Sequence, residues 1–482
     1  MAVLFGSDDI LSTKTQTGER EEVILAGVWK TADQNFASEE EFTASMEELE
    51  ELARACLMEC VCTVTQKLQQ ADKALYVHQG KANEIAELAQ NMEVSRVIFN
   101  DTLSPSQIRN LQKLLKVPVT DRTRLILEIF ERRARTREAK LQVELAKLQY
   151  LKPRLSGLWQ TQTRQGGASG SMSSRGEGEK QLEIDRRTID HRLSELRREL
   201  KVVGREREIQ RKKRTASRIP HVALVGYTNA GKSTIMNAMI DRWMPEGSSD
   251  GKSKKVFAED MLFATLDTSV RRIMPEKGRE FLLSDTVGFI RDLPTALVEA
   301  FHSTLEEVTQ ASVLLQVVDA SDPHSEEQIR TTLDTIASLG AGHIPMITVF
   351  NKCDLSGSPA ASAGSGITAA PGTSAWSQAA VSGPGRYPRR GMKEGDAGGV
   401  TNERVYISAR DPASIELLTE VILEKLESGN TVETFQIPYQ KGAVQAYLTE
   451  HARILSLEYR NDGVLLTADC TKTVAKRARK ML

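Results

Sequence analysis

The chain has 482 residues, of which 40% are hydrophobic and 27% are charged, and this composition is typical of a globular protein. At roughly 150 residues per domain, the length predicts about three domains. The 64 basic and 65 acidic residues nearly cancel, which argues against a protein built only to bind nucleic acid. Five cysteines exclude a disulfide scaffold, and no apolar run reaches the roughly 18 residues that span a bilayer. We therefore expect a cytoplasmic protein, and leave peripheral contact with a membrane open.

The charge is unevenly distributed along the chain. Residues 1–120 carry 11 basic and 19 acidic side chains, residues 121–214 carry 25 and 14, and the remainder is mildly acidic. A basic segment within an otherwise acidic chain is typical of a surface that faces a polyanion. A solvated helical face rich in ion pairs would give the same imbalance, so the charge alone leaves both interpretations open.

Residues 21–120 are predicted to form a small α/β domain, after a polar, disordered tail at 1–20 without a secretory signal. Apolar runs indicate strands at 23–28, 61–64, 94–99 and 117–120. Helices are expected between them, at 45–55, at 81–91 and after Ser104-Pro105. The alternation of strands and helices predicts a parallel sheet covered by helices.

Residues 121–214 are predicted to form a helical hairpin. Apolar residues three, four or seven positions apart indicate one long helix from Thr123 to Pro153, followed by a Gly/Ser-rich tip at 166–176. A second helix begins near Glu177, and its apolar residues repeat in heptads: Leu182, Ile189, Leu193, Leu196, Leu200 and Val203. We expect this seam to pack against the first helix, with a dimer interface as the alternative, and we expect a monomer.

Residues 215–430 are predicted to form a second α/β domain with a doubly wound, mostly parallel sheet. Its first strand, 221–225, leads into a G-x-x-x-x-G-K-[ST] loop, which comprises Gly226, Tyr227, Thr228, Asn229, Ala230, Gly231, Lys232 and Ser233. Such a loop wraps a polyphosphate with its backbone N–H groups, and the following helix adds a favourable dipole. Lys232 is expected to neutralise the β- and γ-phosphates, and the Ser233 hydroxyl to ligate Mg²⁺.

A second motif indicates the base. The apolar run 347–350 precedes the N-K-x-D pattern formed by Asn351, Lys352, Cys353 and Asp354. The Asp354 carboxylate can accept hydrogen bonds from N1–H and the 2-amino group of guanine, whereas adenine offers neither donor. A strand expected at 405–409 ends where a backbone N–H can meet guanine O6, which adds three expected GTP-binding residues: Ser408, Ala409 and Arg410.

Two segments between these motifs are expected to respond to the γ-phosphate. The strand 281–285 ends in Asp285, Thr286, Val287 and Gly288; Asp285 would reach Mg²⁺ through water, and the Gly288 N–H would sense the γ-phosphate. The upstream segment supplies Thr265 as the second protein ligand of Mg²⁺, and it consists of Phe263, Ala264, Thr265, Leu266 and Asp267. Lys232, Thr265 and Gly288 are the predicted catalytic residues.

Gly288 is followed by Phe289, where Ras-like GTPases have a glutamine that orients the attacking water. A phenyl group cannot do this, so intrinsic hydrolysis should be slow or another group must act. Asn229 is similar to the P-loop asparagine of potassium-activated GTPases, which makes it a further catalytic candidate with K⁺ as an additional cofactor. Stabilisation of the loop is the alternative role for Asn229. For the chain as a whole, a GTP-regulated binding protein with negligible hydrolysis is the alternative to a GTPase.

Two further segments complete the chain. Residues 356–402 contain 10 glycines and 4 prolines, which predicts a flexible insertion. Residues 431–482 are expected to form a small C-terminal α/β domain, with strands at 454–459 and 464–467 around the turn Asn461-Asp462-Gly463.

Beyond its nucleotide motifs, the chain resembles the HflX family of translation-associated GTPases over residues 21–350 and 403–482. The segments that carry this resemblance are 103–107, 121–123, 125–127, 142–146, 175–179, 181–183, 285–294, 297–301 and 303–307. Two features depart from the family pattern: Ser171, Met172 and Ser173 interrupt the glycine-rich tip, and the 356–402 stretch is unusually long.

The resemblance implies an N-terminal α/β domain, a hairpin with a glycine-rich tip, a GTPase domain and a small C-terminal domain. It also implies binding of GTP and Mg²⁺, and of the large ribosomal subunit and its RNA, with a role in dissociating ribosomes or rescuing stalled ones. A GTPase of ribosome assembly or RNA modification is the alternative.

Overall fold

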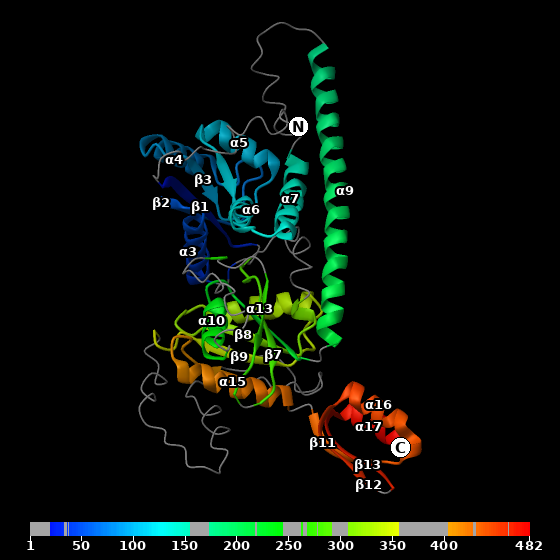
Figure 1. The fold of residues 1–482 in the computed structure, drawn as a ribbon. Helices are drawn as coiled ribbons and strands as arrows, with labels where there is room; N and C mark the ends of the chain where they lie inside the picture. Colours follow the sequence, from blue (N-terminus) through cyan, green and yellow to red (C-terminus); the bar gives the residue numbers. More distant parts are fainter. Residues whose placement is uncertain are drawn as a thin grey trace.

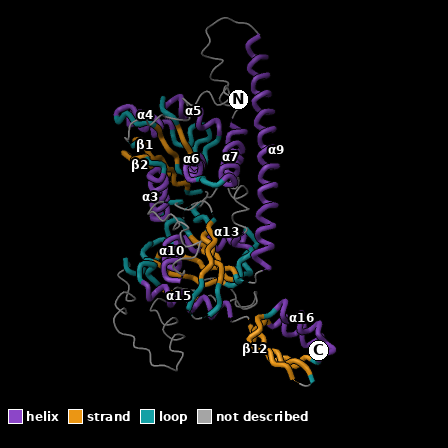
Figure 2. The backbone as a smooth tube through the Cα atoms, viewed as in Figure 1, coloured by secondary structure: helices purple, strands orange, loops and turns teal. Residues whose placement is uncertain are grey.

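The computed structural model describes residues 20–32, 36, 38–154, 173–216, 219–243, 262–263, 268–276, 278–291, 307–355, 403–427, 430–460 and 462–482. Within these ranges the chain forms three sheets, each packed against helices, and one long helix that runs beside the first two (Figures 1 and 2). Residues 1–19 of the predicted tail, most of the hairpin tip and the predicted insertion at 356–402 lie outside the described residues. No helix in the described part of the chain is both long and apolar enough to cross a membrane.

The N-terminal sheet has four parallel strands in the order β2-β1-β3-β4. Side chains of β1 alternate between two cores, as the two-residue period of a strand requires: Val23 and Leu25 enter one, Ile24 and Ala26 the other. The strands are β1 (Glu21–Lys30), β2 (Met58–Leu68), β3 (Arg96–Phe99) and β4 (Val119–Asp121). The helices that cover them are α3 (Glu39–Ala55), α4 (Gln79–Asn91), α5 (Pro105–Leu115) and α6 (Arg122–Arg133).

The prediction of a single long helix from Thr123 to Pro153 is wrong. The chain forms α6 and then a separate helix α7 (Arg137–Leu151), followed by the short 3-10 helix η1 (Lys152–Arg154). Ala134 has an extended backbone with ψ 110°, and the Thr136 hydroxyl accepts a hydrogen bond from Ala139 N at 3.1 Å, so a new helix begins there. The apolar residues keep the same spacing across this break, although they pack into two different hydrophobic cores.

Helix α9 (Ser173–Ala216) has 44 residues and lies along α7 (Figure 1). Ile189, Leu193 and Leu196 pack against apolar side chains of α7, and Arg192 pairs with Glu144 of that helix at 2.7 Å. At its described positions the heptad seam therefore packs within the chain, as expected. The helix starts four residues earlier than predicted.

The second sheet has the order β10-β9-β8-β5-β7-β6, with five parallel strands and β6 antiparallel at one edge. Helices on both faces make it doubly wound, as predicted (Figure 1). Its strands are β5 (His221–Gly226), β6 (Ser269–Ile273), β7 (Phe281–Asp285), β8 (Val313–Asp319), β9 (Met346–Asn351) and β10 (Glu403–Tyr406). Its helices are α10 (Lys232–Trp243), α13 (Ser325–Ser338) and α15 (Pro412–Glu427). β10 ends three residues before the predicted position 409, so the Ser-Ala pair lies in the loop that follows it.

The C-terminal unit is a three-stranded antiparallel sheet in the order β11-β13-β12, with two helices packed on it. Gly463 begins β13 with φ 157°, and a Cβ there would lie 2.4 Å from the Ile437 carbonyl oxygen. Of the predicted turn, Asn461 lies outside the described residues. The elements are β11 (Asn430–Ile437), η3 (Tyr439–Lys441), α16 (Gly442–His451), β12 (Arg453–Arg460), β13 (Gly463–Thr471) and α17 (Lys472–Met481).

Candidate functional site

The loop between β5 and α10 has a shape that requires glycine at two positions. Gly226 and Gly231 adopt φ values of 144° and 95°. A Cβ on Gly226 would lie 2.2 Å from the Val317 carbonyl oxygen, and one on Gly231 would lie 2.2 Å from the Asn351 amide nitrogen. The two glycines therefore let the loop pass close to β8 and β9, at the carboxyl edge of the sheet where ligands of such folds bind.

Lys232 lies under this loop. Its Nζ donates hydrogen bonds to the carbonyl oxygens of Gly226 at 3.0 Å and Tyr227 at 2.5 Å. Burial lowers the pKa of Lys232 to about 8, although the nearby Asp285 carboxylate opposes this shift. The hydrogen bonds of this buried ammonium group go to neutral carbonyl oxygens. A phosphate oxygen beside it would therefore stabilise its charge better.

Ser233 and Asp285 come together beside Lys232. The Ser233 hydroxyl donates to the Asp285 carboxylate at 2.6 Å, and Asp285 is fully buried. A hydroxyl and a carboxylate are the hard oxygen donors that Mg²⁺ prefers, so this pair suits the predicted metal site. The third predicted ligand, Thr265, lies outside the described residues, as do Ala264, Leu266 and Asp267.

The predicted base-binding residues gather on the other side of the loop. The Asn351 amide donates to the Ala230 carbonyl at 3.0 Å, and its oxygen accepts from Ala409 N at 2.9 Å. Lys352 pairs with Asp319 at 2.7 Å, while the Asp354 carboxylate is exposed. Asn351 thus joins the phosphate loop to the Ser-Ala loop, and Asp354 remains accessible to a base.

Gly288 and Phe289 are attached directly to the phosphate loop. Thr228 N donates to the Phe289 carbonyl at 2.9 Å, and Phe289 N donates to the Gly226 carbonyl at 3.1 Å. The Phe289 side chain is 2% exposed and packs beneath the sheet with Ala223 and Val225. The phenyl ring therefore lies in the core, away from the loop surface where water would attack.

The N-terminal domain contacts the phosphate side of this site. The Tyr227 hydroxyl donates to Glu48 of α3 at 2.5 Å and accepts from Arg291 N at 2.7 Å. Arg122, at the start of α6, donates to the second Glu48 oxygen at 2.5 Å, and the Arg291 guanidinium pairs with Glu41. Burial raises the pKa of Tyr227 well above its usual value, so the phenol is the donor in this network.

An apolar contact reinforces this junction. The Phe263 ring lies 4.6 Å from the Phe130 ring in an edge-to-face arrangement, and Val287 and Ile290 join the same core. Sequence reasoning missed the roles of Glu41, Glu48 and Arg122. One indication of this junction was present in the sequence: the segment 121–123 was part of the family resemblance, but no role could be assigned to it from the sequence.

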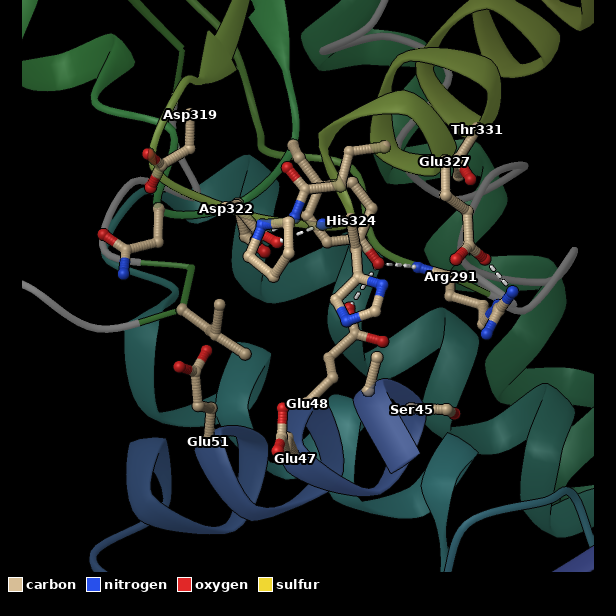
Figure 3. A pocket seen from close by; sticks show the side chains of 17 residues that line it. Ser45, Glu47, Glu48, Glu51, Arg291, Asp319, Asp322, His324, Glu327 and Thr331 are labelled. Atoms are coloured by element: carbon tan, nitrogen blue, oxygen red, sulfur yellow. Dashed lines mark hydrogen bonds and ion pairs between the residues drawn. The ribbon is translucent and has the colours of Figure 1, made fainter. Parts of the chain in front are cut away.

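A cavity of about 310 Å³ lies between α3 and the phosphate loop, beside the contact of Glu48 with Tyr227 (Figure 3). Carboxylates of α3 line one wall, and residues at and after the end of β8 line the other: Glu47, Glu48 and Glu51 face Asp319, Asp322 and His324. Thr228 and Asn229 also border it, but Lys232, Ser233 and Asp354 do not. Among the described residues, the cavity thus adjoins the phosphate loop rather than enclosing its phosphate- and base-binding groups.

A phosphate loop and an N-K-x-D loop at one edge of a doubly wound sheet define a P-loop GTPase, an enzyme that hydrolyses GTP. Family models described as "50S ribosome-binding GTPase", "GTP-binding GTPase N-terminal" and "GTP-binding GTPase Middle Region" match residues 221–352, 43–131 and 133–214. The chain belongs to the HflX family of GTPases.

Three relatives illustrate this membership, all named GTPase HflX. The protein of Caldanaerobacter subterraneus subsp. tengcongensis is 36% identical over 473 residues, which cover 98% of each chain. That of Alkalihalophilus pseudofirmus is 46% identical and covers 69% of this chain and 74% of its own. That of Escherichia coli is 36% identical and covers 88% of both.

Among solved structures, a GTP-binding protein from Sulfolobus solfataricus in complex with GDP is 21% identical. The match covers 84% of this chain and 99% of that protein, with a TM-score of 0.38.

Proposed function

We propose that this GTPase binds the large ribosomal subunit through its RNA and, in a GTP-dependent manner, dissociates ribosomes or rescues stalled ones. The observation that supports this is the basic helix α9, which ends at Ala216, five residues before the strand that leads into the phosphate loop. Exposed basic side chains of this helix, available for phosphate contacts, include Arg186, Arg197, Arg198, Lys201 and Arg205. A ribosomal partner also agrees with the cytoplasmic location expected from the sequence.

At the active site, Lys232 and the backbone of residues 226–233 hold the phosphates, and the Gly288 N–H meets the γ-phosphate. Ser233, Thr265 and, through water, Asp285 would hold Mg²⁺, which would supply positive charge against the phosphates. Asp354 and the Ala409 N–H bind guanine. A K⁺ ion beside Asn229 is a further element of the proposal, and equal turnover in sodium and potassium would remove it.

Sedimentation tests the ribosomal role. Intact ribosomes are mixed with the full chain and a non-hydrolysable GTP analogue, and the expected result is a shift of material to free subunits. Ribosomes that stay intact although the protein co-sediments with them would favour the assembly or RNA-modification alternative. Parallel assays of phosphate release with and without ribosomes address the slow intrinsic hydrolysis expected from Phe289.

Charge reversal tests the part played by α9. We expect the double variant Arg197→Glu/Arg198→Glu to co-sediment with ribosomes much more weakly, and binding of the unaltered chain to weaken steeply with salt. Lys73→Glu/Lys113→Glu, which reverses two exposed charges on the N-terminal domain, is the matched control. Equal loss in both variants, or a flat salt response, would contradict a specific role for α9.

A further inference from the structure

The hydroxyl group of Thr228 is a polar group in the phosphate loop that has no hydrogen-bond partner among the described residues. The residue is 6% exposed, its Oγ1 is buried, and no described residue offers this atom a hydrogen bond. Native proteins rarely leave a buried hydroxyl unsatisfied, and each such case requires an explanation. The neighbouring Tyr227 differs, because its hydroxyl group bonds to both Glu48 and Arg291.

The position of Thr228 supplies an explanation. A Cβ built on Gly288 would lie 2.7 Å from Thr228 Cγ2 and 3.0 Å from Lys232 Nζ, so these three residues meet at one point. The hydrogen bond from Thr228 N to the Phe289 carbonyl holds them in register. Lys232 and the Gly288 N–H are the groups expected to meet the γ-phosphate, so the Thr228 side chain, through the methyl group beside its hydroxyl, adjoins the atoms that react.

Among the described residues, the two other side chains next to this point cannot orient water. The side chain that follows Gly288 is a phenyl ring buried in the core, and the Tyr227 hydroxyl is occupied by the contact with the N-terminal domain. A threonine hydroxyl can donate one hydrogen bond and accept others at the same time. It can therefore bridge an attacking water and a phosphate oxygen.

We propose that Thr228 is a catalytic residue whose hydroxyl group orients the water that attacks the γ-phosphorus. The hydroxyl accepts a hydrogen bond from the water and donates its own hydrogen to a γ-phosphate oxygen. The water oxygen bonds to phosphorus, the bond to the β–γ bridging oxygen breaks, and its electron pair leaves with GDP. The water's proton ends on inorganic phosphate, and Thr228 is unchanged. The inference rests on the GTPase activity of the family and not on the ribosomal role.

Two substitutions separate the hydroxyl group from the rest of the side chain. Thr228→Val keeps the shape and removes the hydroxyl, whereas Thr228→Ser keeps the hydroxyl and removes the methyl. In single-turnover phosphate release from GTP and Mg²⁺ without ribosomes, we expect Thr228→Val to be about 10–100-fold slower. Thr228→Ser should stay within about threefold of the unaltered rate, and the affinity of Thr228→Val for GTP should change by less than about threefold.

Thr332→Val is the matched control, because Thr332 is buried in α13 of the same domain and bonds only within its helix, to the Gln328 carbonyl, among described residues. It should hydrolyse GTP at the unaltered rate. Three results would overturn the proposal: hydrolysis by Thr228→Val at the unaltered rate, equal losses in the valine and serine variants, or a loss of GTP affinity that matches the loss of rate. GDP binding by each variant shows whether its nucleotide site is folded.

Discussion

The two sides of the nucleotide site are built in different ways. On the base side, Asn351 bonds to Ala230 and Ala409, all within the GTPase domain. On the phosphate side, Tyr227 and Arg291 bond to Glu48 and Glu41 of the N-terminal domain. Among the described residues, the base side is thus held by contacts within the GTPase domain, whereas the phosphate side also has contacts with the N-terminal domain.

The physical character of the two sides differs accordingly. Asn351 is a neutral, buried amide whose oxygen and nitrogen both have partners, which rigidifies a loop without burying charge. The phosphate side buries charged groups, since the Arg122 side chain is 3% exposed where it meets Glu48. Loss of one member leaves a desolvated charge, so this junction should respond strongly to small changes.

The largest expected effect is a loss of nucleotide affinity caused by a substitution on the base side. Asp354→Asn should weaken GDP binding by about 100-fold or more, because two hydrogen bonds to a charged acceptor are lost. Binding of xanthosine diphosphate should improve, since an amide can donate to the 2-oxo group of xanthine. Nucleotide titrations measure both, and Asp334→Asn, an exposed carboxylate on α13, is the control. Unchanged GDP affinity would show that Asp354 does not read the base.

An intermediate effect is expected at the phosphate side. Tyr227→Phe should lower the free energy of unfolding by about 1–3 kcal/mol, because Glu48 and the Arg291 N–H each lose a buried partner. Urea denaturation measures this, and a double-mutant cycle with Glu48→Gln should be non-additive. The ratio of GDP to ADP affinity should not change. If that ratio falls, the two sides are not independent.

The smallest expected effect is the change of GDP affinity with pH. Burial lowers the pKa of Lys232 to about 8 in the structure without nucleotide, and phosphates would raise this pKa by direct charge pairing. GDP binding should then take up a proton, and affinity should fall about fourfold between pH 7 and pH 8.5, as the free lysine loses its charge. Calorimetry in buffers of different ionisation enthalpy measures the uptake. Affinity that is flat with pH would place the pKa of Lys232 well above this range.

Sequence reasoning succeeded where one short segment contains a whole motif. The glycine-lysine loop and N-K-x-D each occupy fewer than ten adjacent residues, so their places at strand ends could be predicted, and the doubly wound sheet followed. The break between α6 and α7 could not be predicted. Phe130 and Leu141 fit the same helical spacing of apolar residues, but they pack into different hydrophobic cores. The contact between Glu48 and Tyr227 spans 179 positions, and no local pattern encodes it.

Helix α9 also has a mechanical consequence. At 1.5 Å per residue, its 44 residues make a rod about 66 Å long, and one end lies five residues before β5. A tilt of about 5° around that end would move the far end by about 6 Å. If α9 follows a rotation of the strand that carries the phosphate loop, a small rotation becomes a displacement comparable to a nucleotide's width at the far end of the helix, near Ser173.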